Sequence, residues 1–170
     1  MARLTTKIIL LTALAATAGC ATKRQPLPPA PSEQPAVPAA QEQTQGDGIT
    51  PGSRADFQRS VTSDTVHFAL DQDDLDAEAR GILDSQIAWL GKFPGVGITI
   101  EGHCDERGTR EYNLALGDRR ANAAKNYLAA HGIAATRITT ISYGKERPIA
   151  LGSDDASWAQ NRRAVTIVLN

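Results

Sequence analysis

The sequence has little excess charge, few aromatic residues and no long apolar run. Its 170 residues contain 18 Lys and Arg against 19 Asp and Glu, and aromatic residues make up only 5%. Polyanions are bound through a surplus of basic side chains and bases stack on aromatic rings, so we do not expect a nucleic acid as partner. No apolar run reaches the roughly 18 residues that a membrane-spanning helix requires. A chain of this length has room for one ordinary globular domain, which excludes a large multidomain enzyme.

Cysteine is also scarce, and the first of the two cysteines follows an export signal. Arg3 and Lys7 precede the apolar run at residues 8–16, and small residues lead from there to Cys20. This is the order of the charged, apolar and cleavage regions of a secretory signal. We therefore predict a signal peptide over residues 1–19.

The residues around Cys20 indicate lipidation. Thr17-Ala18-Gly19-Cys20 resembles the box at which bacterial lipoproteins are cut and acylated, although Leu is usual where Thr17 stands. Several acyl chains hold a protein on a membrane durably, because each buried CH₂ contributes about 0.8 kcal/mol. Ala21 is not the Asp that commonly retains such lipoproteins in the inner membrane, so the resemblance implies the outer membrane, with the domain facing the periplasm. The alternative is a plain signal peptide that leaves Cys20 as a free thiol.

Most of the prolines lie in one stretch after Cys20. Seven of the nine fall between Ala21 and Ala55, among Gln, Ala, Ser and Thr. Such a composition buries too little apolar surface to order itself and favours an extended chain. We therefore predict that residues 20–55 form a lipidated, disordered tether ahead of a domain at residues 56–170. A ligand for a proline-binding module is the alternative interpretation.

Apolar periodicity in the second part of the chain predicts alternating strands and helices. Strict alternation favours strands, and spacings near 3.6 favour helices. The predicted strands cover residues 65–68, 96–101, 138–143 and 165–169, and the predicted helices cover residues 79–90, 112–131 and 156–161. This order gives an α+β fold, a two-layer α/β sandwich. With Cys20 acylated, Cys104 has no intramolecular partner, so no disulfide is expected.

One polar stretch between a strand and a helix carries the functional signal. Residues 102–121 read GHCDERGTREYNLALGDRRA, which places Asp105 after the strand and Arg120 on the early turns of the helix. Ligands of α/β folds bind beyond strand ends and near helix starts. The carboxylate and the guanidinium can flank one pocket, which suits a zwitterionic ligand. The alternative is a structural ion pair between Asp105 and Arg120 that joins strand and helix.

Several short segments, taken in order, resemble the OmpA-like peptidoglycan-binding domain. They are VHFALD at 66–71, EGHCDERG at 101–108, YNL at 112–114, RRA at 119–121, SYGKE at 142–146 and NRR at 161–163. Agreement among several ordered motifs is far more specific than any one of them. The resemblance covers Thr65 to Leu169 and implies a mixed four-stranded sheet with helices packed on one face.

The resemblance also implies a ligand and the residues that bind it. The ligand would be the meso-diaminopimelate of the peptidoglycan stem peptide, whose side-chain end carries an amine and a carboxylate. Asp105 would accept from the ammonium, and Arg120 would pair with the carboxylate in the bidentate geometry that suits arginine. A contact loop, a buttress of the turn and further pocket positions are implied at Leu70, Asp71, Gln72, Asp73, Arg107, Asn113 and Leu116. Cys104 stands where Thr or Ala is usual. Cys is similar in volume, so we expect the pocket to survive, and a thiol exposed there would be open to oxidation.

Together with the predicted anchor, the resemblance implies a non-catalytic outer-membrane lipoprotein that tethers the membrane to the cell wall and supports envelope integrity and cell division. The implied partners are peptidoglycan, the membrane lipid around acylated Cys20 and the periplasmic protein TolB, with TolA and outer-membrane proteins as further candidates. The alternative is a domain that serves mainly as a docking module for periplasmic Tol proteins. No cofactor is implied.

Enzymatic and metal chemistry are not favoured. Cys104 neighbours His103, but adjacent residues of a strand point to opposite faces and cannot easily share a proton. No two of the three histidines have the i, i+4 spacing of a helical zinc site. We expect His103 to be a hydrogen-bonded residue at the strand end, and Arg162 or Arg163 to brace either the core or the pocket rim.

Overall fold

Capping side chains set the starts of the two long helices in the computed structural model, which describes residues 49–169. Asp76 accepts a backbone hydrogen bond at 2.8 Å and begins α2 (Ala77–Lys92). Thr109 accepts another at 3.2 Å and begins α3 (Arg110–Ala130). Such caps satisfy backbone N–H groups that have no partner in the first turn of a helix.

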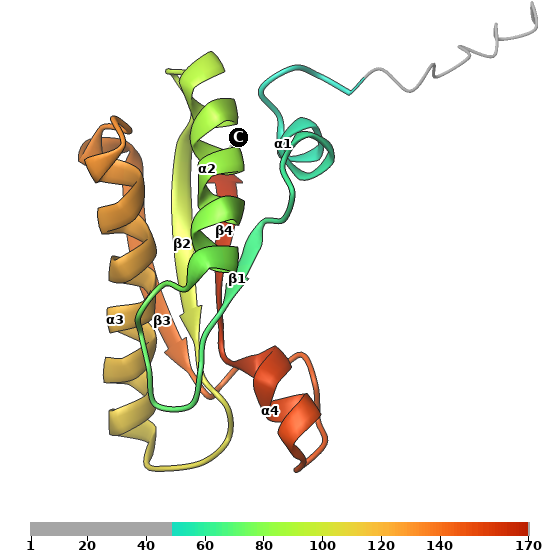
Figure 1. Ribbon diagram of the computed structural model, residues 1–170, viewed down its shortest axis with the longest axis vertical. Coiled ribbons are helices and arrows are strands. Elements are labelled where there is room, and N and C mark those ends of the chain that lie inside the picture. The colour runs from blue at the N-terminus through green and yellow to red at the C-terminus, as the bar shows by residue number, and fades with distance from the viewer. Residues whose placement is uncertain (1–48, 170) are drawn as a thin grey trace, which may run out of the picture. The chain divides into compact units, whose positions relative to one another are not determined.

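The remaining elements complete an alternating order along the chain (Figure 1). They are α1 (Arg54–Ser60), β1 (Thr65–His67), β2 (Gly97–His103), a 3-10 helix (Ala135–Arg137), β3 (Ile138–Gly144), α4 (Asp155–Asn161) and β4 (Arg163–Leu169). Each strand and helix predicted from the sequence is present, with ends that differ by at most two residues. The last strand begins earlier than predicted because Arg163 pairs with His67 of β1.

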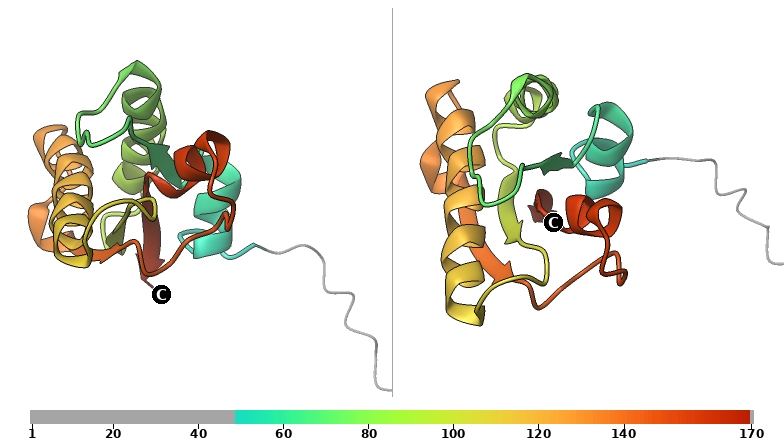
Figure 2. Two further views of the ribbon diagram at one scale, coloured as in Figure 1. Left: turned by 90° about the horizontal axis from the view of Figure 1, so that it is seen from below. Right: turned by 60° about the horizontal axis from the view of Figure 1, so that its bottom comes forward.

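The four strands form one mixed sheet in the order β1-β4-β2-β3. β2 and β3 run parallel, and β4 is antiparallel to both β1 and β2. α2 and α3 pack side by side over one face of the sheet, and α4 lies at the end where β4 begins (Figures 1 and 2). The structure therefore confirms the predicted two-layer α/β sandwich with a mixed four-stranded sheet.

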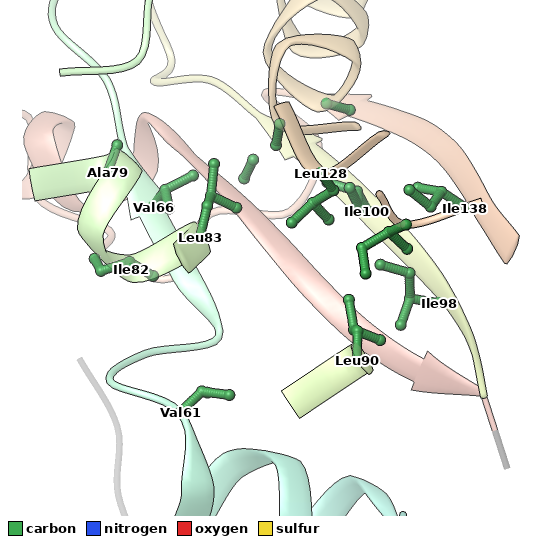
Figure 3. Close-up of a cluster of buried hydrophobic side chains, with 14 of the residues drawn as sticks. Val61, Val66, Ala79, Ile82, Leu83, Leu90, Ile98, Ile100, Leu128 and Ile138 are labelled. Carbon is green, nitrogen blue, oxygen red and sulfur yellow. The ribbon is translucent and has the colours of Figure 1, made fainter. Parts of the chain in front are cut away.

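The core lies between the sheet and the two long helices (Figure 3). Leu83 and Leu90 of α2, Ile98 and Ile100 of β2 and Leu128 of α3 are each at most 1% exposed. Full burial of such a side chain contributes about 1.5–3 kcal/mol. This apolar layer fixes the position of both helices on the sheet.

Two glycines bring α3 unusually close to β2. A Cβ on Gly102 would collide with the carbonyl oxygen of Gly117, and a Cβ on Gly117 would collide with the Ser142 hydroxyl. Only residues without a Cβ allow this approach. The first half of α3 consequently lies directly over the end of β2, so its side chains meet the residues that follow the strand.

α1 was not predicted from the sequence, because its seven residues contain only one large apolar side chain. That side chain, Phe57, is 0% exposed and packs edge-on against the ring of Trp89, with ring centroids 5.0 Å apart. The Trp89 indole N–H also donates to the Asp56 carboxylate at 3.0 Å. Tertiary packing against α2, and not local periodicity, holds this short helix.

Residues 1–48 and 170 lie outside the described residues. They include the predicted signal peptide, Cys20 and most of the predicted tether, so the division of the chain at residue 19 stays a prediction. The predicted end of the tether at residue 55 lies inside α1, which begins at Arg54 after its cap Ser53, so ordered structure begins slightly before that boundary. Among residues 49–169, no helix has both the length and the apolar character needed to cross a membrane.

Candidate ligand-binding site

Residues from separate parts of the chain meet where β2 ends beside the start of α3. They line a cavity of about 10 Å³, here called the Asp105 cavity: Asp71, Cys104, Asp105, Asn113, Leu116, Arg120 and Arg162. The fold thus brings together five of the predicted site residues. The other four, Leu70, Gln72, Asp73 and Arg107, lie in the flanking loops.

Asp105 is a buried carboxylate whose oxygens are already occupied. It is 5% exposed, and Arg107 donates to it from Nη2 at 2.6 Å, from Nε at 3.2 Å and from the backbone N–H at 3.1 Å. Arg162 approaches from the other side, with Nη1 3.4 Å from Oδ2. Burial would raise the pKa of Asp105, but the hydrogen bonds from Arg107 outweigh it and hold the pKa below its usual value. Asp105 is therefore ionised at neutral pH.

Arg120 is fully buried and holds the contact loop against the strand end. Its guanidinium donates to the carbonyl oxygens of Gln72 at 2.8 Å, His103 at 2.9 Å and Ala69 at 3.1 Å, and to Cys104 Sγ at 3.4 Å. These bonds engage four of the five N–H groups of a guanidinium. Burial lowers the pKa of Arg120 from its usual value. Asp105 pairs with other arginines, so the alternative of a structural Asp105–Arg120 ion pair is wrong.

The contact loop runs over the mouth of the site. Asp71 has a φ of 55°, a left-handed backbone conformation that Asp tolerates better than most residues. Leu70 is 51% exposed, and Asp71 contributes to the cavity wall. Asp73 lines a different hollow, an open groove of about 710 Å³ beside α3, where it pairs with the exposed Arg119 at 3.4 Å. That groove is larger than the Asp105 cavity, but its walls hold no buried charged group.

The turn between β2 and α3 is held by hydrogen bonds on both sides. The Asn113 amide donates to the carbonyl oxygens of Arg107 at 2.7 Å and Thr109 at 3.0 Å, which confirms the predicted buttress. Lys145 donates to the Gly108 carbonyl oxygen at 2.7 Å from the other side. Gly108 has a φ of 86°, which favours glycine.

Cys104 and Leu116 form the inner wall of the cavity. Cys104 is 3% exposed and Leu116 is 2% exposed, so this thiol is not the exposed kind that is open to oxidation. The thiol donates to the Asn113 carbonyl oxygen at 3.3 Å, and burial raises its pKa. The close packing of α3 on β2 covers this position. A protonated, enclosed thiol is a poor nucleophile.

The two arginines that the sequence could not separate have different places. Arg162 lies at the cavity, where its Nε donates to the Phe68 carbonyl oxygen at 3.0 Å and its Nη1 faces Asp105. Arg163 does not line the cavity. It donates to the carbonyl oxygens of Asn161 and Arg147. Both arginines precede the strand predicted at residues 165–169, so the sequence held no signal that separates them.

Sequence reasoning missed the part that α4 plays. The Trp158 indole N–H donates to Glu106 at 3.0 Å, and the Arg107 guanidinium carbon lies 4.0 Å from the centroid of the Trp158 ring. α4 therefore holds both the turn and the guanidinium above Asp105. No motif in the sequence links residue 158 to residue 107.

His103 departs from expectation. It is 2% exposed, and neither ring nitrogen has a hydrogen-bond partner, so the expectation of a hydrogen-bonded histidine is wrong. The Tyr143 ring covers it, with centroids 5.5 Å apart, and the Glu101 carboxylate is 3.7 Å from Nε2. Burial, with Arg163 and Arg147 nearby, lowers the pKa of His103 to about 4, so the ring is neutral at neutral pH.

Among residues 49–169, no group of three His, Cys, Asp or Glu side chains is arranged to hold a metal ion. The acidic and basic side chains at the site are the carboxyl groups of Asp71 and Asp105 and the guanidinium groups of Arg107, Arg120 and Arg162.

Comparison with known proteins assigns the chain to a family. Residues 67–162 match the model of the OmpA family. A peptidoglycan-associated lipoprotein of Agrobacterium fabrum is 45% identical over 95% of this chain and 86% of its own length, and one of Rhizobium meliloti is 55% identical over 70% and 67%. The crystal structure of the peptidoglycan-associated lipoprotein from Burkholderia pseudomallei is 39% identical, with a TM-score of 0.63, and covers 67% of this chain and 100% of that one. The chain therefore belongs to the OmpA family, and within it its relatives are peptidoglycan-associated lipoproteins.

Proposed function

We propose that this chain is a non-catalytic outer-membrane lipoprotein whose domain binds the peptidoglycan stem peptide through its meso-diaminopimelate side chain. The observation that carries the proposal is the ionised Asp105 carboxylate, 5% exposed, set at a strand end among arginine side chains. An anion and cations side by side match a ligand that bears an amine and a carboxylate on one carbon. The names of the relatives support the cell wall as the source of that ligand.

The two charges of the ligand would meet different groups. Its ammonium would pair with Asp105, which accepts charge-assisted hydrogen bonds. Its carboxylate would meet arginine, and the side chains of Arg107 and Arg162 are 35% and 15% exposed. The resemblance gave this pairing to Arg120, but Arg120 is 0% exposed and its guanidinium donates to backbone carbonyl oxygens. It would instead add its positive charge from below and position the contact loop through Ala69 and Gln72.

The anchor and the partners complete the proposal. Acylation of Cys20 would hold the chain in the outer membrane with the domain in the periplasm, and the proline-rich stretch after it would provide reach to the wall. The chain would thereby tether the outer membrane to peptidoglycan as part of the Tol-Pal system, supporting envelope integrity and constriction at cell division. TolB would be its protein partner, with TolA and outer-membrane proteins as further partners.

A second candidate function is a docking module for periplasmic Tol proteins. It is favoured by apolar side chains left in solvent: Leu70 on the contact loop is 51% exposed, and Ile149 and Leu151 after β3 are 59% and 86% exposed. Where such side chains form one contiguous patch, they mark a protein-binding surface. The two functions can use overlapping parts of one surface.

Sacculus binding tests the proposal. The full-length chain is incubated with purified sacculi that contain meso-diaminopimelate and with sacculi that contain lysine at the same position, and the bound fraction is sedimented. We expect retention on the first wall only, and release by a free stem tripeptide that contains meso-diaminopimelate. Equal retention on both walls, or no release by the peptide, would contradict the proposal. No retention on either wall would favour the docking module.

A further inference from the structure

The Asp105 carboxylate is already occupied by a cation of the protein. Arg107 donates to its two oxygens at 2.6 and 3.2 Å, and Asp105 itself is 5% exposed. A ligand ammonium would need the same two oxygens. A ligand cation can therefore pair fully with Asp105 only if an arginine of the protein moves away from it.

Arg107 is the arginine that can move away from Asp105. Its side chain is 35% exposed and contacts Asp105 through two of its nitrogens, at 2.6 and 3.2 Å. Arg162 is 15% exposed and is tied to the Phe68 carbonyl oxygen, and Arg120 is 0% exposed with four bonds to the chain. Arg107 lies in the loop between β2 and α3, directly before Gly108, so its side chain can turn outward without moving a strand or a helix.

The guanidinium of Arg107 also contacts an aromatic ring at the rim while it is paired with Asp105. The Trp158 ring lies 4.0 Å from its central carbon, and cation–π contacts stabilise a charge that keeps part of its hydration. An outward turn that keeps this ring contact would leave Arg107 within reach of a ligand bound at Asp105.

The charges make the exchange selective. The groups around the cavity are two carboxylates, Asp71 and Asp105, and the three guanidiniums of Arg107, Arg120 and Arg162. A ligand that brings only a cation replaces one ion pair by another and leaves Arg107 facing only Asp71 and Asp155, neither of which is within ion-pair distance of it. A ligand that brings a cation and a carboxylate gives a partner to both Asp105 and Arg107. Only the second exchange ends with one more ion pair than it began with.

We propose that Arg107 determines the specificity of the site: it occupies the ammonium position on Asp105 as an internal competitor, and it yields to ligands that carry an ammonium and a free carboxylate together. The inference rests on the proposed function and deepens it, because it names the residue that would make the site reject lysine-type and amidated wall peptides. Arg107 would then act twice, first as the displaced cation and afterwards as a partner of the ligand carboxylate.

Calorimetric titration of the full-length chain tests the inference. The probes are three stem tripeptides, with meso-diaminopimelate, with its side-chain amide, and with lysine at the third position. Arg107→Met removes the charge and keeps the aliphatic stem. Arg107→Lys keeps a cation at the position, and Arg110→Met is the matched control, since Arg110 is 61% exposed and pairs only with the exposed Glu146.

We expect Arg107→Met to bind the lysine and amidated peptides at least about tenfold more tightly than the parent does. The ratio of their Kd to that of the diaminopimelate peptide should fall accordingly. Arg107→Lys and Arg110→Met should keep the parental ratio. Thermal unfolding of each variant confirms that the fold is intact.

Two results would overturn the inference, and they can be told apart from failure of the proposed function. If Arg107→Met weakens only the diaminopimelate peptide and leaves the lysine peptide unchanged, Arg107 is a simple contact of the ligand carboxylate. If Arg107→Lys loses the discrimination, the internal cation is not its cause. If the parent binds no diaminopimelate peptide at all, the proposed function itself is wrong and the inference falls with it.

Discussion

Arg120 should be as important for stability as for binding. Replacing it by Ala removes the donors to three carbonyl oxygens, those of Ala69, Gln72 and His103, which lie 2.8–3.1 Å from the guanidinium. Each buried acceptor left without a donor costs about 1–3 kcal/mol. Water can enter the space and satisfy part of the loss, so we expect Arg120→Ala to lower the free energy of unfolding by about 3 kcal/mol. That is a large fraction of the 5–15 kcal/mol typical of a domain.

Urea denaturation followed by tryptophan fluorescence measures this effect. Arg120→Lys keeps the charge but cannot reach three carbonyl oxygens at once. We therefore expect it to lower the free energy of unfolding by about half as much as Arg120→Ala does. Arg119→Ala is the control, because its side chain is 46% exposed and its pair with Asp73 spans 3.4 Å, a contact worth at most about 1 kcal/mol. If Arg120→Ala and Arg119→Ala unfold at the same urea concentration with the same slope, the buried guanidinium does not hold the loop and this reasoning is wrong.

Three further predictions concern other parts of the chain. The pKa of His103 is about 4 in the fold against about 6.5 when unfolded, so its contribution to stability is complete above pH 6.5 and falls by up to about 3 kcal/mol as the pH drops toward 4. His103→Leu should flatten this part of the unfolding profile, and an unchanged slope would count against a buried neutral ring. Phe57→Ala should lower the free energy of unfolding by about 3–5 kcal/mol, because its ring is 0% exposed. Unaltered denaturation curves would show that α1 adds little to the fold. Cys20→Ala should release the chain from outer membranes whose cell wall has been digested, as cell fractionation can show, whereas a mutant that still sediments with those membranes would have another anchor.

Most of the fold could be predicted from the sequence, because the patterns that indicate its strands and helices are local. Alternation at residues 96–101 and the 3.6 spacing at residues 79–90 depend on one face of each element being apolar. Asp105 could be placed at a strand end for the same reason. α1 could not be predicted, since Phe57 is a single apolar residue and its helix depends on contact with Trp89, 32 positions away.

Which side chains pair with one another in the site was harder to predict from the sequence. The sequence offers several arginines to Asp105, and only the distances set by the turn and by the strand pairing show that Arg107 and Arg162 reach it while Arg120 bonds to backbone carbonyl oxygens. Cys104 illustrates the same limit. Its burial follows from the close approach of Gly102 and Gly117, which no pattern at position 104 reveals.

The most direct test of the central claim is the affinity of the Asp105→Asn variant for the meso-diaminopimelate stem tripeptide. Asparagine keeps the size of the side chain and removes the charge that would pair with the ligand ammonium. Glu111→Gln, which neutralises an exposed carboxylate in the first turn of α3, serves as control. Losing one half of a buried charge pair costs about 2–5 kcal/mol, so the account predicts that Asp105→Asn raises Kd at least about thirtyfold while Glu111→Gln leaves it unchanged. A folded Asp105→Asn variant that binds the peptide as tightly as Glu111→Gln would contradict the account.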